Sequence, residues 1–173
     1  HLPEVSQAEI VSVFVDCIID AKVMERFPNL KCIAVRSTGY DNIDLSTAAK
    51  RNIIVLNVPA YGENTVAEFT FGLILNLSRK IGQAYDQVRE EGSFNLEKLQ
   101  GFDLSGKTIG IIGTGKIGRN VAQIAKGFDM NILAFDMYPN EVLAKEIGFK
   151  YAPFKDVLAQ SDIVTLHVPY MKE

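Results

Sequence analysis

A glycine-rich segment between two apolar runs holds the residues with the clearest chemistry. The run Thr108–Ile112 leads into Gly113-Thr114-Gly115-Lys116-Ile117-Gly118. A segment with helical periodicity follows, and a second apolar run then ends at Asp136. A strand, a G-x-G-x-x-G turn, a helix and an acidic residue about 20 positions later together form the dinucleotide-binding fingerprint. The segment therefore predicts a dinucleotide site.

Each part of this segment has its own physical role. Gly113 allows the tight turn, Gly115 lets a pyrophosphate approach the backbone, and Gly118 lets the helix pack close to the sheet. The free N–H groups at the start of the helix favour phosphates. The Asp136 carboxylate can bond both ribose hydroxyls, and Met137-Tyr138-Pro139 offers no Arg or Lys for a 2′-phosphate. We therefore expect NAD(H) rather than NADP(H) as the cofactor.

Composition narrows the class of protein. The chain has 173 residues, of which 47% are hydrophobic, and a formal net charge of −3. It can form apolar cores, and its charge gives no reason to expect nucleic acid or an anionic membrane as a partner. No apolar run approaches the ~20 residues of a membrane span. Cys17 and Cys32 lack metal-ligand spacing and lie in apolar stretches, which indicates buried free thiols in a reducing cytoplasm.

Strand and helix patterns alternate along the chain, which is typical of βαβ units and parallel sheets. Before residue 60 the pattern predicts three strands, Ile10–Val15, Leu30–Arg36 and Ile53–Val58, and two helices, Ile18–Phe27 and Asp44–Arg51. After the fingerprint it predicts helices over Glu141–Ile147 and Phe154–Gln160, and strands near Lys150 and over Asp162–Val168. The chain from Thr108 onward is therefore predicted to form the first half of a doubly wound sheet.

A long helix is predicted between these two parts. Thr65-x-x-Glu68 matches a capping box, and the helix that it opens should run to about Glu91, before Gly92. Its first turns, over residues 66–77, are apolar on nearly all sides, so the helix must be buried between domains or against another subunit. A boundary at Pro59–Asn64 is expected, with domains over residues 1–60 and 61–173.

Five blocks follow one another along the chain: Arg36–Asp44, Asn57–Tyr61, Thr65–Glu68, Leu104–Gly118 and Ser161–Pro169. Together they resemble the NAD-dependent D-isomer-specific 2-hydroxyacid dehydrogenases, and within them the D-lactate dehydrogenase branch. The resemblance implies two doubly wound α/β domains: part of a flavodoxin-like substrate domain and an incomplete Rossmann NAD-binding domain. It also implies a cytoplasmic homodimer that uses NAD and a small 2-keto or 2-hydroxy acid, with pyruvate and D-lactate foremost.

Matched residue by residue, the resemblance assigns roles in both domains. Thr38 and Gly39 would offer backbone N–H groups to the substrate carboxylate, and Tyr61 would lie at the hinge beside the substrate. Lys116 and Ile117 would contact the pyrophosphate. The full set implied for the cofactor is Gly113, Thr114, Gly115, Lys116, Ile117, Gly118, Asp136, His167, Val168 and Pro169.

Other interpretations of these positions stay open. The segment around Thr38 can be a simple polar turn, and Tyr61 can be a packing residue of the hinge. Arg36 can clamp a carboxylate or, as arginines at strand ends more often do, pair with an acid. His167 ends a strand, where ligands of α/β proteins gather, and it is expected to be a neighbour of the cofactor rather than the proton donor.

Reduction of a 2-keto acid needs a hydride from the nicotinamide, a proton donor and a cation that holds the carboxylate. The resemblance implies an Arg, a Glu and a His for this work, all downstream of Val168-Pro169. No catalytic residue and no metal ligand is therefore assigned here, and the chain is expected to be a fragment without turnover of its own.

Two other functions fit the same residues. One is an NAD-binding regulatory relative, similar to the family's transcriptional corepressors, without dehydrogenase activity. The acidic net charge argues weakly against it. The other is a different nucleotide-dependent class on this fold, such as a methyltransferase, against which Gly118 and Val168-Pro169 argue.

Overall fold

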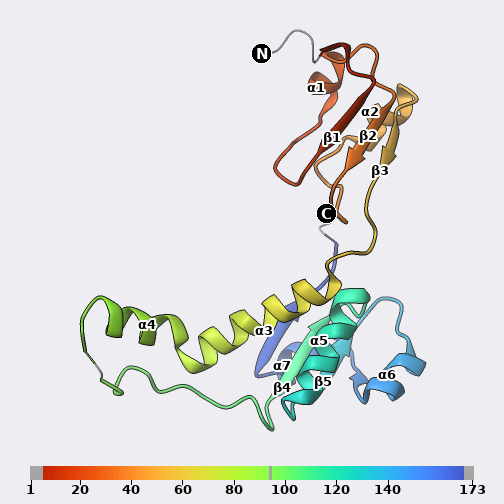
Figure 1. Cartoon of the computed structure of the whole chain (residues 1–173). Helices are drawn as coiled ribbons and strands as arrows, with labels where there is room; N and C mark the ends of the chain where they lie inside the picture. The colour runs from red at the N-terminus through yellow and green to blue at the C-terminus, as the bar shows by residue number, and fades with distance from the viewer. Residues whose placement is uncertain (1–5, 94, 170–173) are drawn as a thin grey trace. The chain divides into compact units, whose positions relative to one another are not determined.

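Parallel strands connected by helices build two separate sheets in this chain (Figure 1). The computed structural model describes residues 6–93 and 95–169. One compact unit ends at Tyr61 and the next begins at Gly62. This division falls within the segment Pro59–Asn64.

The first sheet has three parallel strands in sequential order, β1 (Ile10–Val13), β2 (Cys32–Val35) and β3 (Ile54–Leu56). Two short helices connect them, α1 (Ala21–Glu25) and α2 (Leu45–Lys50). The first helix begins later than predicted because Asp20 caps it and accepts a hydrogen bond from the N–H of Val23 at 2.8 Å. Buried side chains around Met24 and Ile33 form the core of this unit.

The second sheet contains four parallel strands in the order β6-β5-β4-β7. They are β4 (Thr108–Ile112), β5 (Asn131–Phe135), β6 (Lys150–Tyr151) and β7 (Ile163–Leu166), and the connecting helices are α5 (Lys116–Gly127), α6 (Glu141–Ile147) and α7 (Phe154–Gln160). The chain leaves β4 for one neighbour, β5, and later returns to its other side as β7. The carboxyl ends of β4 and β7 therefore form the switch point at which open α/β sheets bind ligands.

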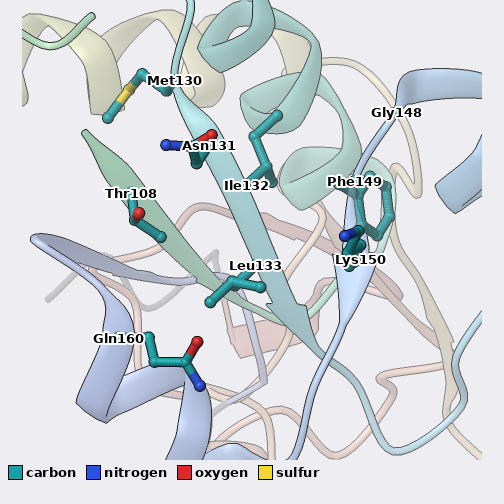
Figure 2. A pocket seen from close by; sticks show the side chains of 9 residues that line it. All are labelled: Thr108, Met130, Asn131, Ile132, Leu133, Gly148, Phe149, Lys150 and Gln160. Atoms are coloured by element: carbon teal, nitrogen blue, oxygen red, sulfur yellow. The ribbon is translucent and has the colours of Figure 1, made fainter. Parts of the chain in front are cut away.

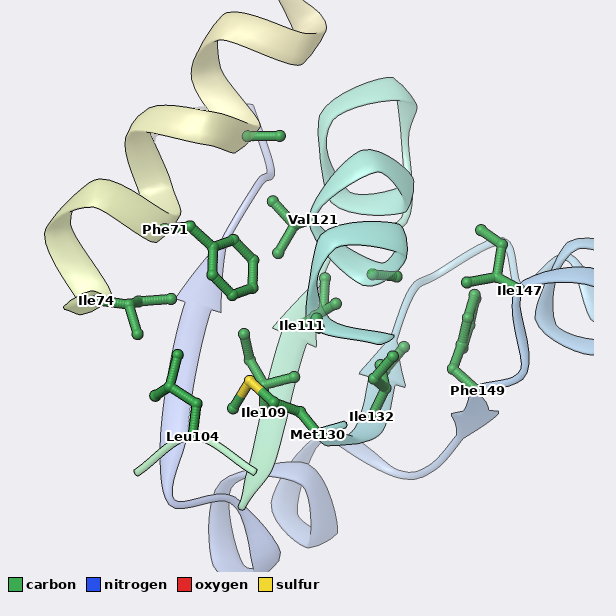
Figure 3. Close-up of a cluster of buried hydrophobic side chains, with 14 of the residues drawn as sticks. Phe71, Ile74, Leu104, Ile109, Ile111, Val121, Met130, Ile132, Ile147 and Phe149 are labelled. Carbon is green, nitrogen blue, oxygen red and sulfur yellow. The ribbon is translucent and has the colours of Figure 1, made fainter. Parts of the chain in front are cut away.

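Helices cover both faces of this second sheet. On one face, α3 (Glu63–Arg79) and α5 pack on β4 and β5 through one apolar cluster that includes Phe71, Ile111 and Val121 (Figure 3). On the other face, β4 touches α7 so closely that a Cβ at Gly110 would lie 2.8 Å from the Val157 side chain. This two-sided parallel sheet confirms the predicted fold class.

The long helix differs from its prediction. It begins at Glu63 with Gly62 as its N-cap, so the capping box at Thr65 and Glu68 was a wrong prediction. It also breaks at Lys80, which adopts a left-handed conformation with φ of 56°, before α4 (Ile81–Arg89) begins.

The helical hydrogen-bond pattern changes at this break. In a continuous helix the carbonyl of Ser78 would accept from the N–H of Gly82. Instead, the Ser78 carbonyl accepts from the N–H of Phe102 at 2.9 Å, and Gly82 donates to the Asn76 side chain at 2.8 Å. Both partners of the missing helical bond are therefore satisfied elsewhere: the Ser78 carbonyl by Phe102 and the Gly82 N–H by the side chain of Asn76.

The surroundings of the two cysteines differ from the prediction. Cys17 is exposed and Cys32 is half-buried, so the prediction of two buried thiols was wrong. The reason is that β1 ends at Val13 and the chain turns outward before Cys17, whose N–H donates to the Phe14 carbonyl at 3.0 Å. In the described part of the chain, every helix is too short or too polar to span a bilayer.

Candidate functional site

The turn after β4 requires glycine at its first position. Gly113 has a φ of 92°, and its N–H donates to the carbonyl of Phe135 at 2.8 Å. A Cβ here would lie 2.5 Å from the backbone oxygen of His167, which is closer than real Cβ atoms come to oxygen. Gly113 therefore lets the carboxyl ends of β4, β5 and β7 meet at one place.

The other two glycines of the motif, Gly115 and Gly118, differ in the space around them. A Cβ at Gly118 would lie 2.0 Å from the Gly113 oxygen, so this glycine is required for α5 to pack on the turn. A Cβ at Gly115, the N-cap of α5, would meet no protein atom within 4 Å. The backbone beside the start of α5 is thus open, where free N–H groups favour a phosphate. This open cradle fits the pyrophosphate of a dinucleotide.

Asp136 directly follows β5 and faces the same turn. Its Oδ2 accepts from the N–H of Thr114 at 2.6 Å and from the Thr114 hydroxyl at 2.9 Å, and its Oδ1 accepts from the N–H of Tyr138 at 2.9 Å. Partial burial raises the pKa of Asp136, but these hydrogen bonds outweigh it and hold the pKa below the ordinary value of 3.8. The carboxylate is therefore charged at neutral pH, as an acceptor for ribose hydroxyls must be.

Two residues that the sequence analysis missed complete this network. The hydroxyl of Tyr151 lies 2.7 Å from that of Thr114 and accepts from the N–H of Asn140 at 3.1 Å. The sequence held only part of the signal for Tyr151: a tyrosine hydroxyl near a predicted strand needs a polar partner, but the place of β6 beside β5 comes from the structure.

Lys116 and Ile117 begin α5. The Nζ of Lys116 lies 3.4 Å from a carboxylate oxygen of Glu63, and the Asn120 side chain donates to that of Asn64 at 2.6 Å. Ile117 is half-buried and packs against the core. The start of α5 is therefore tied to the first turn of α3, a link that sequence patterns did not indicate.

His167, Val168 and Pro169 follow β7 at the same edge. The His167 N–H donates to the Ile112 carbonyl at 2.8 Å, and the ring Nε2 lies 3.0 Å from the Thr165 hydroxyl. Burial lowers the pKa of His167 below its ordinary 6.5, so the ring is neutral at pH 7. Val168 and Pro169 are exposed beside the Gly113 turn. All ten predicted cofactor residues thus gather at the carboxyl edge of one sheet.

A pocket of about 350 Å³ lies elsewhere on this sheet (Figure 2). Its lining includes Thr108 and Asn131, the first residues of β4 and β5, together with Lys150 of β6. It therefore lies towards the amino ends of the strands, away from the candidate site.

The predicted substrate residues lie in the first unit, in the turn after β2. The Thr38 hydroxyl donates to the Val58 carbonyl at 3.0 Å, and the Asn57 side chain donates to the Thr38 carbonyl at 2.9 Å. The backbone N–H groups of Thr38 and Gly39 have no acceptor among the described residues. A braced turn with two unpaired N–H groups can bind a carboxylate.

Two further predicted positions, Arg36 and Tyr61, also belong to the first unit. The Arg36 guanidinium lies over the Phe14 ring, 5.6 Å from its centroid, so it contacts an aromatic ring rather than the predicted acid. Tyr61, the last residue of the first unit, is 61% exposed, which leaves its ring accessible for a ligand.

The NAD-binding-domain model of the D-isomer specific 2-hydroxyacid dehydrogenases matches residues 71–173, more than half of the chain. The chain belongs to this family. It is 44% identical over 167 residues to a 2-hydroxyacid dehydrogenase homolog of Haemophilus influenzae, covering 95% of this chain and 50% of that protein. It is 41% identical over 167 residues to a D-lactate dehydrogenase of Escherichia coli, with the same two coverages.

A solved structure agrees with these sequence matches. The D-lactate dehydrogenase from Aquifex aeolicus, complexed with NAD and lactic acid, has a TM-score of 0.87 at 38% identity, over 97% of this chain and 50% of that one. The family resemblance and NAD as the cofactor of this domain are confirmed. The family match also decides against a methyltransferase. The chain spans about half the length of these relatives.

Substitution of Gly115 should separate cofactor binding from folding. In Gly115→Ala the new methyl group meets no protein atom, so we expect the free energy of unfolding to stay within about 0.5 kcal/mol of wild type. The methyl group would occupy the open backbone beside α5, and the Kd for NADH should rise by about tenfold or more. Urea denaturation and NADH titration of the purified protein measure the two quantities.

Gly118→Ala is the matched control. Its Cβ would clash with the Gly113 oxygen, so overpacking should lower the free energy of unfolding by about 1–3 kcal/mol. A Gly115→Ala protein with wild-type affinity for NADH would contradict the role assigned to Gly115.

Proposed function

We propose that the whole protein is an NAD-dependent D-2-hydroxyacid dehydrogenase that reduces a small 2-keto acid, with pyruvate foremost, to the D-isomer. The observation that carries the proposal is the charged Asp136 beside an open, glycine-lined turn, in a chain of this dehydrogenase family. Similarity to proteins named D-lactate dehydrogenase favours pyruvate and D-lactate within the acid class.

Each cofactor residue has a proposed role that follows from its position. The N–H groups at the start of α5 and the Lys116 ammonium bind the pyrophosphate, and Asp136 accepts from the adenosine ribose. His167, Val168 and Pro169 line the cofactor from the end of β7. When bound, NADH supplies the hydride.

The first unit has a proposed role as part of the substrate domain. The N–H groups of Thr38 and Gly39 bind the substrate carboxylate, since they are unpaired within the described structure and the turn around them is braced. Tyr61, exposed at the end of this unit, lies beside the substrate in this proposal. A cytoplasmic location stays a prediction from the resemblance.

The activity of the whole protein tests this function. We expect NADH oxidation with pyruvate or a close homologue such as glyoxylate or 2-oxobutyrate, and chiral analysis should show the D-isomer of lactate. An L-product would contradict the proposal. NADH binding without turnover of any of these acids would favour the regulatory alternative instead.

Cofactor preference provides a second test. Asp136 bonds free ribose hydroxyls and repels a 2′-phosphate, so NADH should bind at least about tenfold more tightly than NADPH. Asp136→Ala should remove most of this preference. Because the pKa of Asp136 is lowered, its contribution is present above that pKa and is lost only as the pH falls through it. The Asp136 contribution to NADH binding should therefore be constant from about pH 5 to 8, whereas the repulsion of NADPH should grow as its 2′-phosphate loses a second proton near pH 6.

Asp156→Ala is the control for loss of a carboxylate, since Asp156 is an exposed residue of α7 outside the site. Titration of both nucleotides measures the preference. Equal or tighter binding of NADPH by the wild-type protein would refute the assignment of Asp136.

We also propose that the whole protein is a homodimer that buries the outer face of α3. Phe69, Leu73 and Leu77 on this face are 68%, 51% and 69% exposed, whereas Phe71 and Ile74 are buried in their own unit. Apolar surface in water costs ~25 cal/mol per Å². A two-fold dimer is the commonest way to cover such a face, although another part of one chain could also cover it.

Leu73→Glu should therefore shift the protein from dimer to monomer. The control Val142→Glu changes a more exposed apolar residue, 77% exposed on α6, and should stay dimeric. Light scattering at micromolar concentration measures both masses. A monomeric wild-type protein would rule out the dimer.

A further inference from the structure

Tyr151 reaches the cofactor turn from a neighbouring strand. It belongs to the two-residue strand β6, where it pairs in register with Ala134 of β5. Its ring packs edge-on against Phe149 with centroids 5.2 Å apart. Its hydroxyl lies 2.7 Å from the hydroxyl of Thr114. The Tyr151 hydroxyl is therefore held from both sides, by its own strand and by the turn.

Chemistry fixes the direction of these hydrogen bonds. The ionised carboxylate of Asp136 can only accept, so the Thr114 hydroxyl donates its one hydrogen to Asp136. The Tyr151 hydroxyl must then donate to Thr114, while its oxygen accepts from the N–H of Asn140. The result is a one-way chain from Asn140 through Tyr151 and Thr114 to Asp136, in which each bond polarises the next.

This hydrogen-bond chain also limits which acceptor positions of the Asp136 carboxylate are available to a ligand. A carboxylate offers about four acceptor positions. Thr114 occupies two of them through its N–H and its hydroxyl, and the N–H of Tyr138 occupies a third. About one acceptor position is left for a ribose hydroxyl, and the Thr114 hydroxyl, 2.7 Å from that of Tyr151, limits where this position can face.

We propose that Tyr151 is a positioning residue for the adenosine ribose subsite, acting on Asp136 through the Thr114 hydroxyl. The inference rests on the proposed role of Asp136 and extends it to Tyr151, whose partners in the structure are Thr114, Asn140 and Phe149. Tyr151→Phe keeps the ring against Phe149 and removes only the hydroxyl that aligns Thr114.

The test uses nucleotide binding by the whole protein, with ADP-ribose as the probe of the adenosine half. Tyr151→Phe should raise the Kd for ADP-ribose and NADH by about three- to tenfold, the effect of one hydrogen bond. Thr114→Val should raise both Kd values at least as much, and Thr114→Ser, which keeps a hydroxyl, should restore affinity close to wild type.

The double variant separates positioning from a general structural effect. If Tyr151 acts through Thr114, adding Tyr151→Phe to Thr114→Val should change the Kd for ADP-ribose by less than about 1.5-fold. Tyr85→Phe, which removes a tyrosine hydroxyl bonded to Arg89 on α4, should leave both Kd values unchanged. Urea denaturation of each variant checks its folding.

Two outcomes would overturn the proposal: an unchanged Kd in Tyr151→Phe, or a full effect of Tyr151→Phe in the Thr114→Val background. Asp136→Ala distinguishes this failure from failure of the proposed function. If Asp136→Ala weakens ADP-ribose binding and Tyr151→Phe does not, only the role of Tyr151 is wrong. If neither has an effect, the assignment of the ribose subsite is wrong as well.

Discussion

Close backbone contact between the ends of β4 and β7 is the constraint on which the candidate site depends. The N–H of His167 donates to the Ile112 carbonyl at 2.8 Å, and the backbone oxygen of His167 leaves no room for a side chain at Gly113. The next glycine-dependent contact, Gly118 on the Gly113 oxygen, brings α5 down onto the same turn. The strand ends, the turn and the helix start are thereby held together, and among the three motif glycines of the described structure Gly115 is the one with open space beside it for a ligand.

The polar groups of the site are held in place by hydrogen bonds from the loops around this crowded turn. Asp136 receives hydrogen bonds from the turn after β4 and from its own loop after β5. Tyr151 adds a third element, β6, although this strand is only two residues long. A carboxylate held from several loops loses little freedom when a ligand arrives, and such preorganisation favours affinity.

Sequence patterns predicted the parts of this arrangement that depend on local rules. The predicted bounds of β4, α6 and α7 match the structure, because glycines, prolines and apolar runs mark them clearly. The break at Lys80 was missed because its cause, the bond from Phe102 to Ser78, joins segments that are far apart in the sequence. Tyr151 was missed for a similar reason, since its role depends on the strand order that places β6 beside β5.

The bond from Phe102 to Ser78 also has a consequence for how this family can vary. Together with the ion pair between Arg79 and Asp103, at 2.6 Å, it joins the two ends of the stretch that leaves α3 and returns towards β4. Within this stretch α4 has no buried residue. A segment whose two ends are held together, and whose helix α4 lies outside the core, can change in length or sequence at little cost to the sheet, because closure entropy grows slowly with loop length. The stretch is therefore a place where related chains can diverge while the nucleotide fold stays intact.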